Sequence, residues 1–413
     1  MTDVFRYMVI FLLLAVASRQ IGKLFSSIGL PYITGYLLVG MIAGPFVLGM
    51  LPASAVTELR FVDDLSLGVI AFIAGSEFYL KDIRANAKKI AVTLSGVIVV
   101  AFPLTGLALF YLTQYLPFAA DMPTTWKIAL ALLGATILLA LSPPSTIAVI
   151  KEVQASGPFT RTVLGVTVTM DVVIVALFAF SVAIAGGLIN DAEIGAGFLG
   201  LLLIDIGGAA LVGWLMGKLL QVIFTLSVSK WIATFATVVL GYGVFASSHY
   251  VTALTAGSAF EMHVEPLLVV LISGFYIANF TTHRRRFEEL LHTVGPYIYV
   301  AFFTLTGVGI KLDILVQTWA IALALFAIRV VAIYLGSYLG MRQLKEPAKF
   351  HRFMGLALIT QAGIALGLSR EVAIEFPSLG EAFATLVISV VVVNEMFGPI
   401  FLKMALKRVG ETN

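Results

Sequence analysis

Residues 126–150 read WKIALALLGATILLALSPPSTIAVI, a hydrophobic stretch interrupted by the double proline Pro143–Pro144. As a helix, the stretch is long enough to cross the ~30 Å hydrocarbon core of a bilayer. Two consecutive prolines remove two backbone donors, which predicts that this helix is broken near its middle. Non-helical backbone at bilayer depth is tolerated only where it is buried in protein or lines a cavity. The stretch therefore predicts a broken transmembrane helix inside a larger bundle.

A single acid, Asp171, follows within the next apolar run, residues 164–185. A carboxylate at the bilayer centre costs at least about 2.5–3.5 kcal/mol, so it is a functional-site hypothesis by default. Broken helices beside buried polar groups form the ion sites of secondary transporters near the membrane midplane. One carboxylate can hold either a proton or an alkali cation, and mutually exclusive occupancy is sufficient for exchange. The alternative is a structural aspartate that is hydrogen-bonded to a neighbouring helix.

Composition indicates the class of protein. Apolar residues make up 60% of the 413, and charged residues only 12%. So many apolar stretches of spanning length predict an all-α polytopic membrane protein. We expect thirteen transmembrane helices, the first of them retained as a span, near residues 4–22, 30–49, 64–80, 90–113, 126–150, 161–186, 196–217, 229–250, 266–281, 294–310, 316–340, 353–369 and 379–405.

The basic residues predict the orientation of the chain. Most of the 26 lysines and arginines fall in alternate loops and in the C-terminal tail, including the triplet Arg284–Arg286. By the positive-inside rule, the N-terminus is expected outside and the C-terminus in the cytoplasm. We expect a multi-pass protein of a cell membrane, most simply the bacterial cytoplasmic membrane. The triplet is interpreted as a topology signal rather than a nucleic-acid patch, and the absence of cysteine excludes thiolate metal sites.

The predicted spans suggest an internal duplication. Spans one to six can be aligned with spans eight to thirteen, with span seven as a connector. An odd connector places the two six-helix halves in opposite orientations, which is the inverted-repeat plan of many transporters. On this alignment the broken fifth span corresponds to the twelfth, where Gln361–Gly363 and Gly367 offer a second weak point, and Asp171 corresponds to Asn394–Glu395.

Four groups of residues carry a resemblance to a known family. They are the second span with Leu30-Pro31, Gly35, Gly40 and Gly44-Pro45; Ala74–Glu77 at the end of span three; Ser142–Glu152 followed by Asp171; and Phe302–Gly309 with Leu358–Gly363. Together they resemble the membrane domain of the monovalent cation:proton antiporters, sodium/hydrogen exchanger type, nearest the Kef-like branch. The resemblance implies the sodium/proton antiporter fold, with two crossed broken helices.

The resemblance also implies a division of labour along the chain. It implies elevator-type alternating access, a homodimer, a core of spans four to six and eleven to thirteen, and a dimerisation panel of spans one to three and eight to ten. The corresponding segments are 1–113 (panel 1–80, core span 90–113), 114–186 with the broken helix and Asp171, connector 187–225, panel spans 226–310, and core spans with a short tail 311–413.

Candidate ligands surround the predicted break. The Ser142, Ser145 and Thr146 hydroxyls and the carbonyls freed by the prolines are hard oxygen ligands, suited to an alkali cation at Asp171. Met170 stands where relatives carry Asp, Asn or Gln, so Thr169 or Thr167 are expected to supply a hydroxyl instead. Glu77 and Gln361 are pathway candidates.

A buried basic residue, Arg329, is predicted within span eleven, where an always-charged guanidinium must find a partner. Glu395 is the expected partner. Arg329 has either a role in transport or a purely structural role in an ion pair. In the family that this chain resembles, a basic residue here balances helix dipole ends, and arginine accompanies electroneutral exchange. With Met170 adding no second carboxylate, one cation is expected to exchange for one proton.

The leading hypothesis is therefore a secondary antiporter, not an enzyme, that exchanges Na⁺ or K⁺ for H⁺ and needs no cofactor. Its expected partners are the lipid bilayer, a second copy of the chain, and the transported ions, with no nucleic acid. An anion or organic-acid symporter on the same plan is the first alternative, and a non-transporting membrane sensor is the second. Only the antiporter requires a titrating acid at Asp171.

Overall fold

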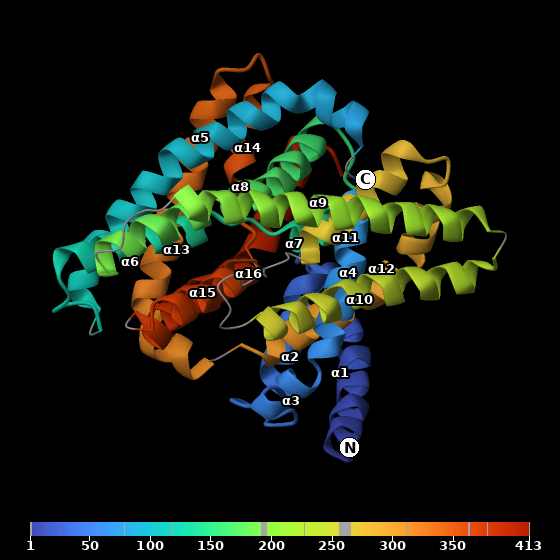
Figure 1. Cartoon of the computed structure of the whole chain (residues 1–413), viewed down its shortest axis with the longest axis horizontal. Helices are drawn as coiled ribbons and strands as arrows, with labels where there is room; N and C mark the ends of the chain where they lie inside the picture. Colours follow the sequence, from blue (N-terminus) through green and yellow to red (C-terminus); the bar gives the residue numbers. More distant parts are fainter. Residues whose placement is uncertain are drawn as a thin grey trace. The chain divides into compact units, whose positions relative to one another are not determined.

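A computed structural model describes residues 2–77, 79–116, 118–190, 196–226, 228–255, 266–310, 312–361, 364–377 and 379–412. These residues form helices and connecting turns, as the all-α prediction requires (Figure 1). The helices are α1 (Thr2–Ser27), α2 (Tyr32–Ala43), α3 (Ala53–Glu58), α4 (Arg60–Glu77), α5 (Leu80–Leu112), α6 (Thr124–Leu139), α7 (Pro143–Glu152), α8 (Pro158–Asn190), α9 (Ala196–Thr225), α10 (Lys230–Thr255), α11 (Pro266–Phe280), α12 (Arg284–Val308), α13 (Leu312–Arg342), α14 (Ala348–Ala357), α15 (Ile364–Glu375) and α16 (Gly380–Val409). A short 3₁₀ turn, Thr113–Tyr115, follows α5.

Nine helical segments in the described residues, counting α6 and α7 together, are long and apolar enough to cross a membrane. Two further apolar helices, α2 and α11, are shorter. The predicted span 30–49 was too long at its end: α2 stops at Ala43 because Gly44-Pro45 follows, and proline cannot continue the helix. The short helix α3 was not predicted.

The described chain divides into two compact units. The first contains residues 1–28, 35–84 and 200–310, and the second contains residues 29–34, 85–199 and 311–413. The first unit thus holds α1, α3, α4 and α10–α12, while the second holds α6–α8 and α13–α16. Helices α2, α5 and α9 each contribute residues to both units.

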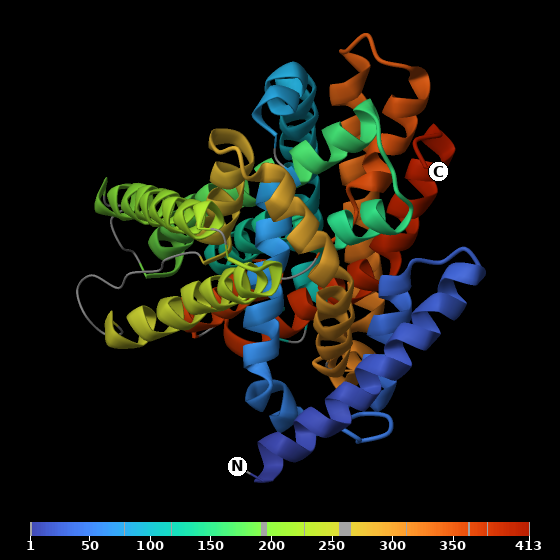
Figure 2. The same ribbon diagram turned by 90° about the vertical axis from the view of Figure 1, so that its right-hand side faces the viewer.

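Within the first unit, α10, α11 and α12 pack around α4 (Figure 2). Glycines permit the closest approaches. A Cβ added at Gly75 on α4 would collide with the Leu271 carbonyl on α11, and one at Gly40 on α2 would collide with the Thr304 carbonyl on α12. Small residues at such positions let backbones meet directly, which stabilises helix pairs in a membrane.

Within the second unit, α8 packs on α6, and α13, α14 and α16 lie side by side (Figure 1; Figure 2). Its helix ends are capped by sequence signals. Pro158 begins α8 at a position where the missing backbone donor costs nothing. Gly410 ends α16 with φ of 84°, a left-handed conformation that glycine adopts without strain.

Candidate ion-binding site

The first helix break lies where the double proline predicts it. Helix α6 ends at Leu139, the backbone of Ala140–Ser142 is non-helical, and α7 begins at Pro143. Ser142 caps α7: its Oγ accepts a hydrogen bond from the Ser145 backbone N–H at 3.2 Å and donates one to Ser145 Oγ at 2.9 Å. Pro143 occupies the first helical position, where proline is favoured. The break is therefore a helix end followed by a helix start, not a kink.

A second break separates α14 from α15. Helix α14 ends at Ala357, and Leu358–Gln361 are non-helical before α15 begins at Ile364. This lies at the weak point predicted around Gln361–Gly363, of which Ala362 and Gly363 fall outside the described residues.

The two breaks meet inside the second unit. Thr146 Oγ1 on α7 and Thr360 Oγ1 in the second break form a hydrogen bond at 3.0 Å. Gln361 Nε2 donates to the Ile137 carbonyl near the end of α6 at 2.9 Å. All four residues are buried. A backbone carbonyl near the first break thus accepts a hydrogen bond from a side chain at the second, as buried polar groups require.

Arg329 joins both breaks from α13. It is fully buried, and its guanidinium donates to the carbonyls of Leu138 (2.6 Å), Ala140 (2.9 Å) and Ile359 (2.7 Å). A fourth bond, 2.7 Å long, goes to Asn394 Oδ1 on α16. The first two carbonyls belong to the end of α6, and the third follows the end of α14. The rigid, planar fork of arginine suits this fixed array of acceptors.

These contacts account for the buried charge without a carboxylate. A helix C-terminus carries roughly −0.5 of an elementary charge, so the ends of α6 and α14 together supply about −1 beside one guanidinium. The pairing expected between Arg329 and Glu395 is therefore corrected: in the described residues Arg329 contacts Asn394, the neighbour of Glu395. Adjacent residues on a helix point about 100° apart, so Asn394 can face Arg329 while Glu395 faces elsewhere.

Asn394 and Gln361 extend the polar network. Asn394 Nδ2 donates to Gln361 Oε1 at 2.9 Å and to the Val390 carbonyl at 2.8 Å. Both amides are fully buried. Sequence reasoning named Gln361 as a pathway candidate and Asn394 only through repeat symmetry, so their role as a bridge between Arg329 and α6 was missed. The available signal was a pair of large amides within otherwise apolar helices.

Asp171 lies on the unbroken helix α8 and is half-buried. Ideal helix geometry estimates its level to be that of the first break. The level follows from a contact between α6 and α8, in which Thr136 Oγ1 and Ser181 Oγ are 2.7 Å apart. Asp171 is ten residues from Ser181, or about 15 Å along α8 toward its connection with α7. On the other side of the same contact, residues 137–139 continue α6 and residues 140–142 are extended, so the chain advances about 15 Å from Thr136 to Ser142. Asp171 and Ser142 therefore lie at about the same distance from the Thr136–Ser181 contact.

The neighbours of Asp171 on α8 occupy different sides of the helix. Thr169 is half-buried, but residues two apart do not share a helix face. Thr167, one turn before Asp171, shares its face; its Oγ1 is buried and donates to the Val163 carbonyl at 2.9 Å. Met170 is fully buried. Of the remaining predicted residues, Glu395 is buried, and the side chain of Glu77 lies outside the described residues.

A buried ion pair fixes the far end of α7. Lys403 Nζ on α16 lies 2.7 Å from Glu152 Oε1, with side chains 6% and 4% exposed. The same ammonium donates to the Leu30 carbonyl at 2.9 Å, and Glu152 Oε2 accepts from the Tyr32 backbone N–H at 2.7 Å. Both partners therefore also hold residues 29–34, the start of the second predicted span.

Comparison with known proteins identifies the family. The profile described as "Sodium/hydrogen exchanger, transmembrane" matches residues 9–408. Two relatives from Bacillus cereus are each 24% identical. The Na(+)/H(+)-K(+) antiporter GerN aligns over 95% of this chain and 94% of its own length, and the probable Na(+)/H(+) antiporter GerT over 84% and 86%.

Solved structures match the fold over the whole chain. The sodium proton antiporter MjNhaP1 from Methanocaldococcus jannaschii at pH 8 superposes with a TM-score of 0.71 at 18% identity, covering 99% of this chain and 100% of that one. An electron-microscopy structure of the same antiporter gives 0.70 at 19% identity, covering 97% and 94%. The chain therefore belongs to the sodium/hydrogen exchanger family and is a multi-pass membrane antiporter of a monovalent cation and protons, not an enzyme.

Proposed function

We propose that this antiporter exchanges Na⁺ or K⁺ for H⁺ at Asp171, which holds the two ions alternately. The proposal is supported by the half-buried position of Asp171 on α8, together with the Thr136–Ser181 contact from which helix geometry estimates that Asp171 is level with the break between α6 and α7. Asp171→Asn tests it, because an amide cannot alternate between proton and cation. Vesicles that contain this variant should no longer dissipate a pH gradient when Na⁺ or K⁺ is added. Retained exchange in a correctly folded variant contradicts the assignment and favours a symporter.

Ser142, Ser145, Thr146 and a threonine of α8, Thr169 or Thr167, are the proposed oxygen ligands. Ser145 and Thr146 lie in the first turn of α7, where hydroxyl oxygens are next to the freed backbone. Ser145→Ala with Thr146→Ala should raise the half-saturating cation concentration while exchange persists, because the acid remains. An unchanged half-saturating concentration would remove both hydroxyls from the site.

The proposed stoichiometry is one cation for one proton. Its support is that Arg329 is balanced by helix ends and an amide, and that Met170 adds no second acid next to Asp171. An electroneutral cycle moves no net charge, whereas each net charge moved would gain about 2.3 kcal/mol per 100 mV of membrane potential. Current on a solid-supported membrane should therefore be absent. A steady current that reverses with the cation gradient would contradict this and implicate Glu395.

Potassium is included because the relative GerN is named as a Na(+)/H(+)-K(+) antiporter. Transport of each cation is measured by adding it alone to vesicles with a pH-sensitive dye inside. If only sodium collapses the pH gradient, the potassium part of the proposal is wrong. Gln361 and Glu77 remain pathway proposals, and replacement of each by alanine should slow exchange without changing the ion preference.

The proposed architecture has thirteen spans in two inverted six-helix repeats, with the second unit as the moving core and the first as the dimerisation panel. Its support is the grouping of α6–α8 with α13–α16, each set containing one broken helix. We assign the N-terminus outside and the C-terminus to the cytoplasm of a bacterial cell membrane. Cysteine labelling at Thr2 and Glu411 would test the orientation, and the mass of the purified protein in detergent would test the homodimer.

A further inference from the structure

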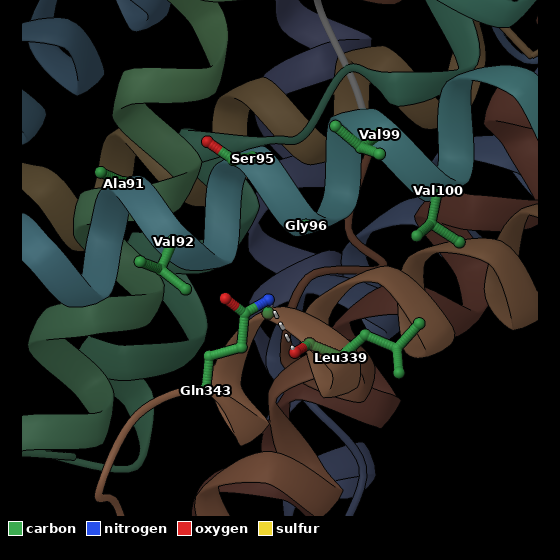
Figure 3. Close-up of a pocket in the computed structure, with 9 residues that line it drawn as sticks. Ala91, Val92, Ser95, Gly96, Val99, Val100, Leu339 and Gln343 are labelled. Carbon is green, nitrogen blue, oxygen red and sulfur yellow. Dashed lines mark hydrogen bonds between the residues drawn. The ribbon is translucent and has the colours of Figure 1, made fainter.

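A groove runs between α5 and α13 on the second unit (Figure 3). It encloses about 350 Å³ and is lined mainly by Val92, Gly96, Val99, Leu339 and Gly340. The lining also contains Ala91, Val100 and two polar side chains, Ser95 and Gln343. In Figure 3, Gln343 reaches from the end of α13 toward α5, and Val92 reaches toward it from the opposite side. The volume lies at the lower end of the ~300–1,000 Å³ range of small-molecule sites.

The floor of the groove is made by glycines that let the two helices touch. A Cβ at Gly96 would lie 2.5 Å from the Gly336 carbonyl oxygen, and one at Gly340 would lie 2.7 Å from the Val92 carbonyl oxygen. Gly336 and Gly340 are four residues apart, the spacing that permits close helix packing in membranes. Because the glycines carry no side chains, the larger residues beside them form raised walls. The groove is therefore fixed by backbone contacts rather than by mobile side chains.

The walls are apolar and exposed. Val99 on α5 and Leu339 on α13, which line the groove, are 71% and 48% exposed, and Leu335 and Val331 continue from Leu339 along α13 outside the lining with exposures of 40% and 53%. The three α13 residues follow at intervals of four, so they form one stripe along the helix. In a membrane-spanning chain, an exposed apolar stripe of this kind faces hydrocarbon. The groove thus offers a lipid acyl chain a place to lie along the protein.

Each of the two helices carries a cation one turn from a lining residue, at the same end of the groove. Lys88 lies one turn before Val92 on α5, and Arg342 lies one turn after Leu339 on α13. Both are exposed, and among the described residues neither takes part in an ion pair. The nearby acid Glu346 is already bound by Lys89 at 2.7 Å. The end of the groove therefore carries two positive charges that are free to bind an anion.

We propose that this groove is a binding site for one anionic phospholipid, with an acyl chain along Val92–Val99 and Leu339 and its phosphate between Lys88 and Arg342. Basic pockets between transmembrane helices are suited to anionic headgroups, and each lysine or arginine at the membrane surface strengthens binding about fivefold. Gln343 adds an amide donor next to the phosphate. Neither the ion exchange nor the family membership requires such a site.

The test measures lipid retention by the full-length protein in detergent, using native mass spectrometry with phosphatidylglycerol or phosphatidylcholine of the same chains. The unmodified protein should retain phosphatidylglycerol preferentially. Lys88→Gln with Arg342→Gln should weaken that binding about 30-fold, since two cations are lost. The matched control, Lys23→Gln with Arg408→Gln, removes two exposed cations from α1 and α16, the helices that do not form the groove, and should change binding less than threefold.

A second variant tests the acyl chain independently of charge. Ser95 is exposed and lines the groove, so Ser95→Trp fills the groove while the glycines themselves are unchanged, and it should abolish retention. Equal retention of phosphatidylglycerol by both groove variants and the unmodified protein would overturn the proposal. Equal loss in the control would do the same. If millimolar inorganic phosphate displaces the lipid, the site binds a free anion and the assignment to a phospholipid is wrong.

Discussion

The buried pair between Glu152 and Lys403 predicts a large and specific loss of stability. Lys403→Met replaces lysine with an unbranched apolar side chain of similar length, so the aliphatic packing is largely kept and the ammonium group is removed. Two contacts are lost: the 2.7 Å ion pair with Glu152 and the 2.9 Å bond to the Leu30 carbonyl. Glu152 is 4% exposed, so its carboxylate would remain buried with its charge uncompensated. Breaking a buried pair in this way costs about 3–5 kcal/mol of unfolding free energy.

The assay is unfolding of the purified protein in mixed micelles by increasing sodium dodecyl sulfate, followed by the fluorescence of its four tryptophans. Lys407→Met is the matched control, because Lys407 lies one turn further along α16 and is exposed. The control should stay within about 0.5 kcal/mol of the unmodified protein. The difference between the two lysines isolates the effect of the buried partner from that of losing a charge on α16.

A double-mutant cycle separates the pair from its surroundings. Glu152→Gln alone leaves the buried ammonium without a counter-charge, and it should destabilise the protein as Lys403→Met does. The double variant has no uncompensated charge, so it should be no less stable than the worse single variant. The coupling energy should then be at least about 3 kcal/mol, the size of the smaller single effect. Additive single effects, or a Lys403→Met variant within 1 kcal/mol of the unmodified protein, would refute the reasoning.

Three further changes have defined outcomes. Arg329→Lys leaves three donors for four acceptors, so one buried acceptor loses its hydrogen bond. The free energy of unfolding, measured with the same detergent assay, should fall by about 1–3 kcal/mol. An unchanged free energy of unfolding would contradict the network. Glu411→Ala removes the carboxylate that accepts hydrogen bonds from the backbone N–H groups of Phe159 and Thr160 and from the Thr160 hydroxyl, in the first turn of α8. Amide hydrogen exchange in that turn should become faster, because a helix cap of this kind contributes about 1 kcal/mol. Unchanged exchange would argue against a cap. Gly336→Ala places a Cβ 2.6 Å from the Gly96 carbonyl oxygen and should lower the free energy of unfolding by about 1–3 kcal/mol. The control Gly243→Ala adds a Cβ that meets no atom within 4 Å and should raise the free energy of unfolding by up to about 1 kcal/mol. Similar effects at both glycines would contradict the close helix contact.

The helices could be predicted from the sequence because hydrocarbon permits few backbone conformations. An apolar stretch in a membrane must satisfy its backbone internally, so hydropathy and helix position agree. Pro143–Pro144 also located the first break, since proline acts on its own backbone. The end of α2 was missed because hydropathy continues through Phe46–Leu48 after the helix has stopped at Ala43.

Side-chain partners could not be predicted to the same degree. The sequence predicted that Arg329 is buried in the membrane. However, three of its four acceptors are backbone carbonyls, which are available to it because two helices end beside it. A sequence shows side-chain charges and not freed carbonyls, so a carboxylate was the natural expectation. Glu152 and Lys403 are 251 positions apart, and no spacing rule links them.

The uncharged surroundings of Arg329 bear on how the antiporter can work. A guanidinium held by a carboxylate would lose its partner whenever that carboxylate took up a proton. Carbonyl dipoles at the ends of α6 and α14 do not titrate, so their balance with Arg329 persists when a proton binds elsewhere. In the proposed cycle, the crossing of the two broken helices therefore keeps the same charge in the proton-bound and cation-bound states. Under this proposal Asp171 alone alternates, and a proton or one monovalent cation neutralises it equally, which is the electrostatic condition for one-for-one exchange.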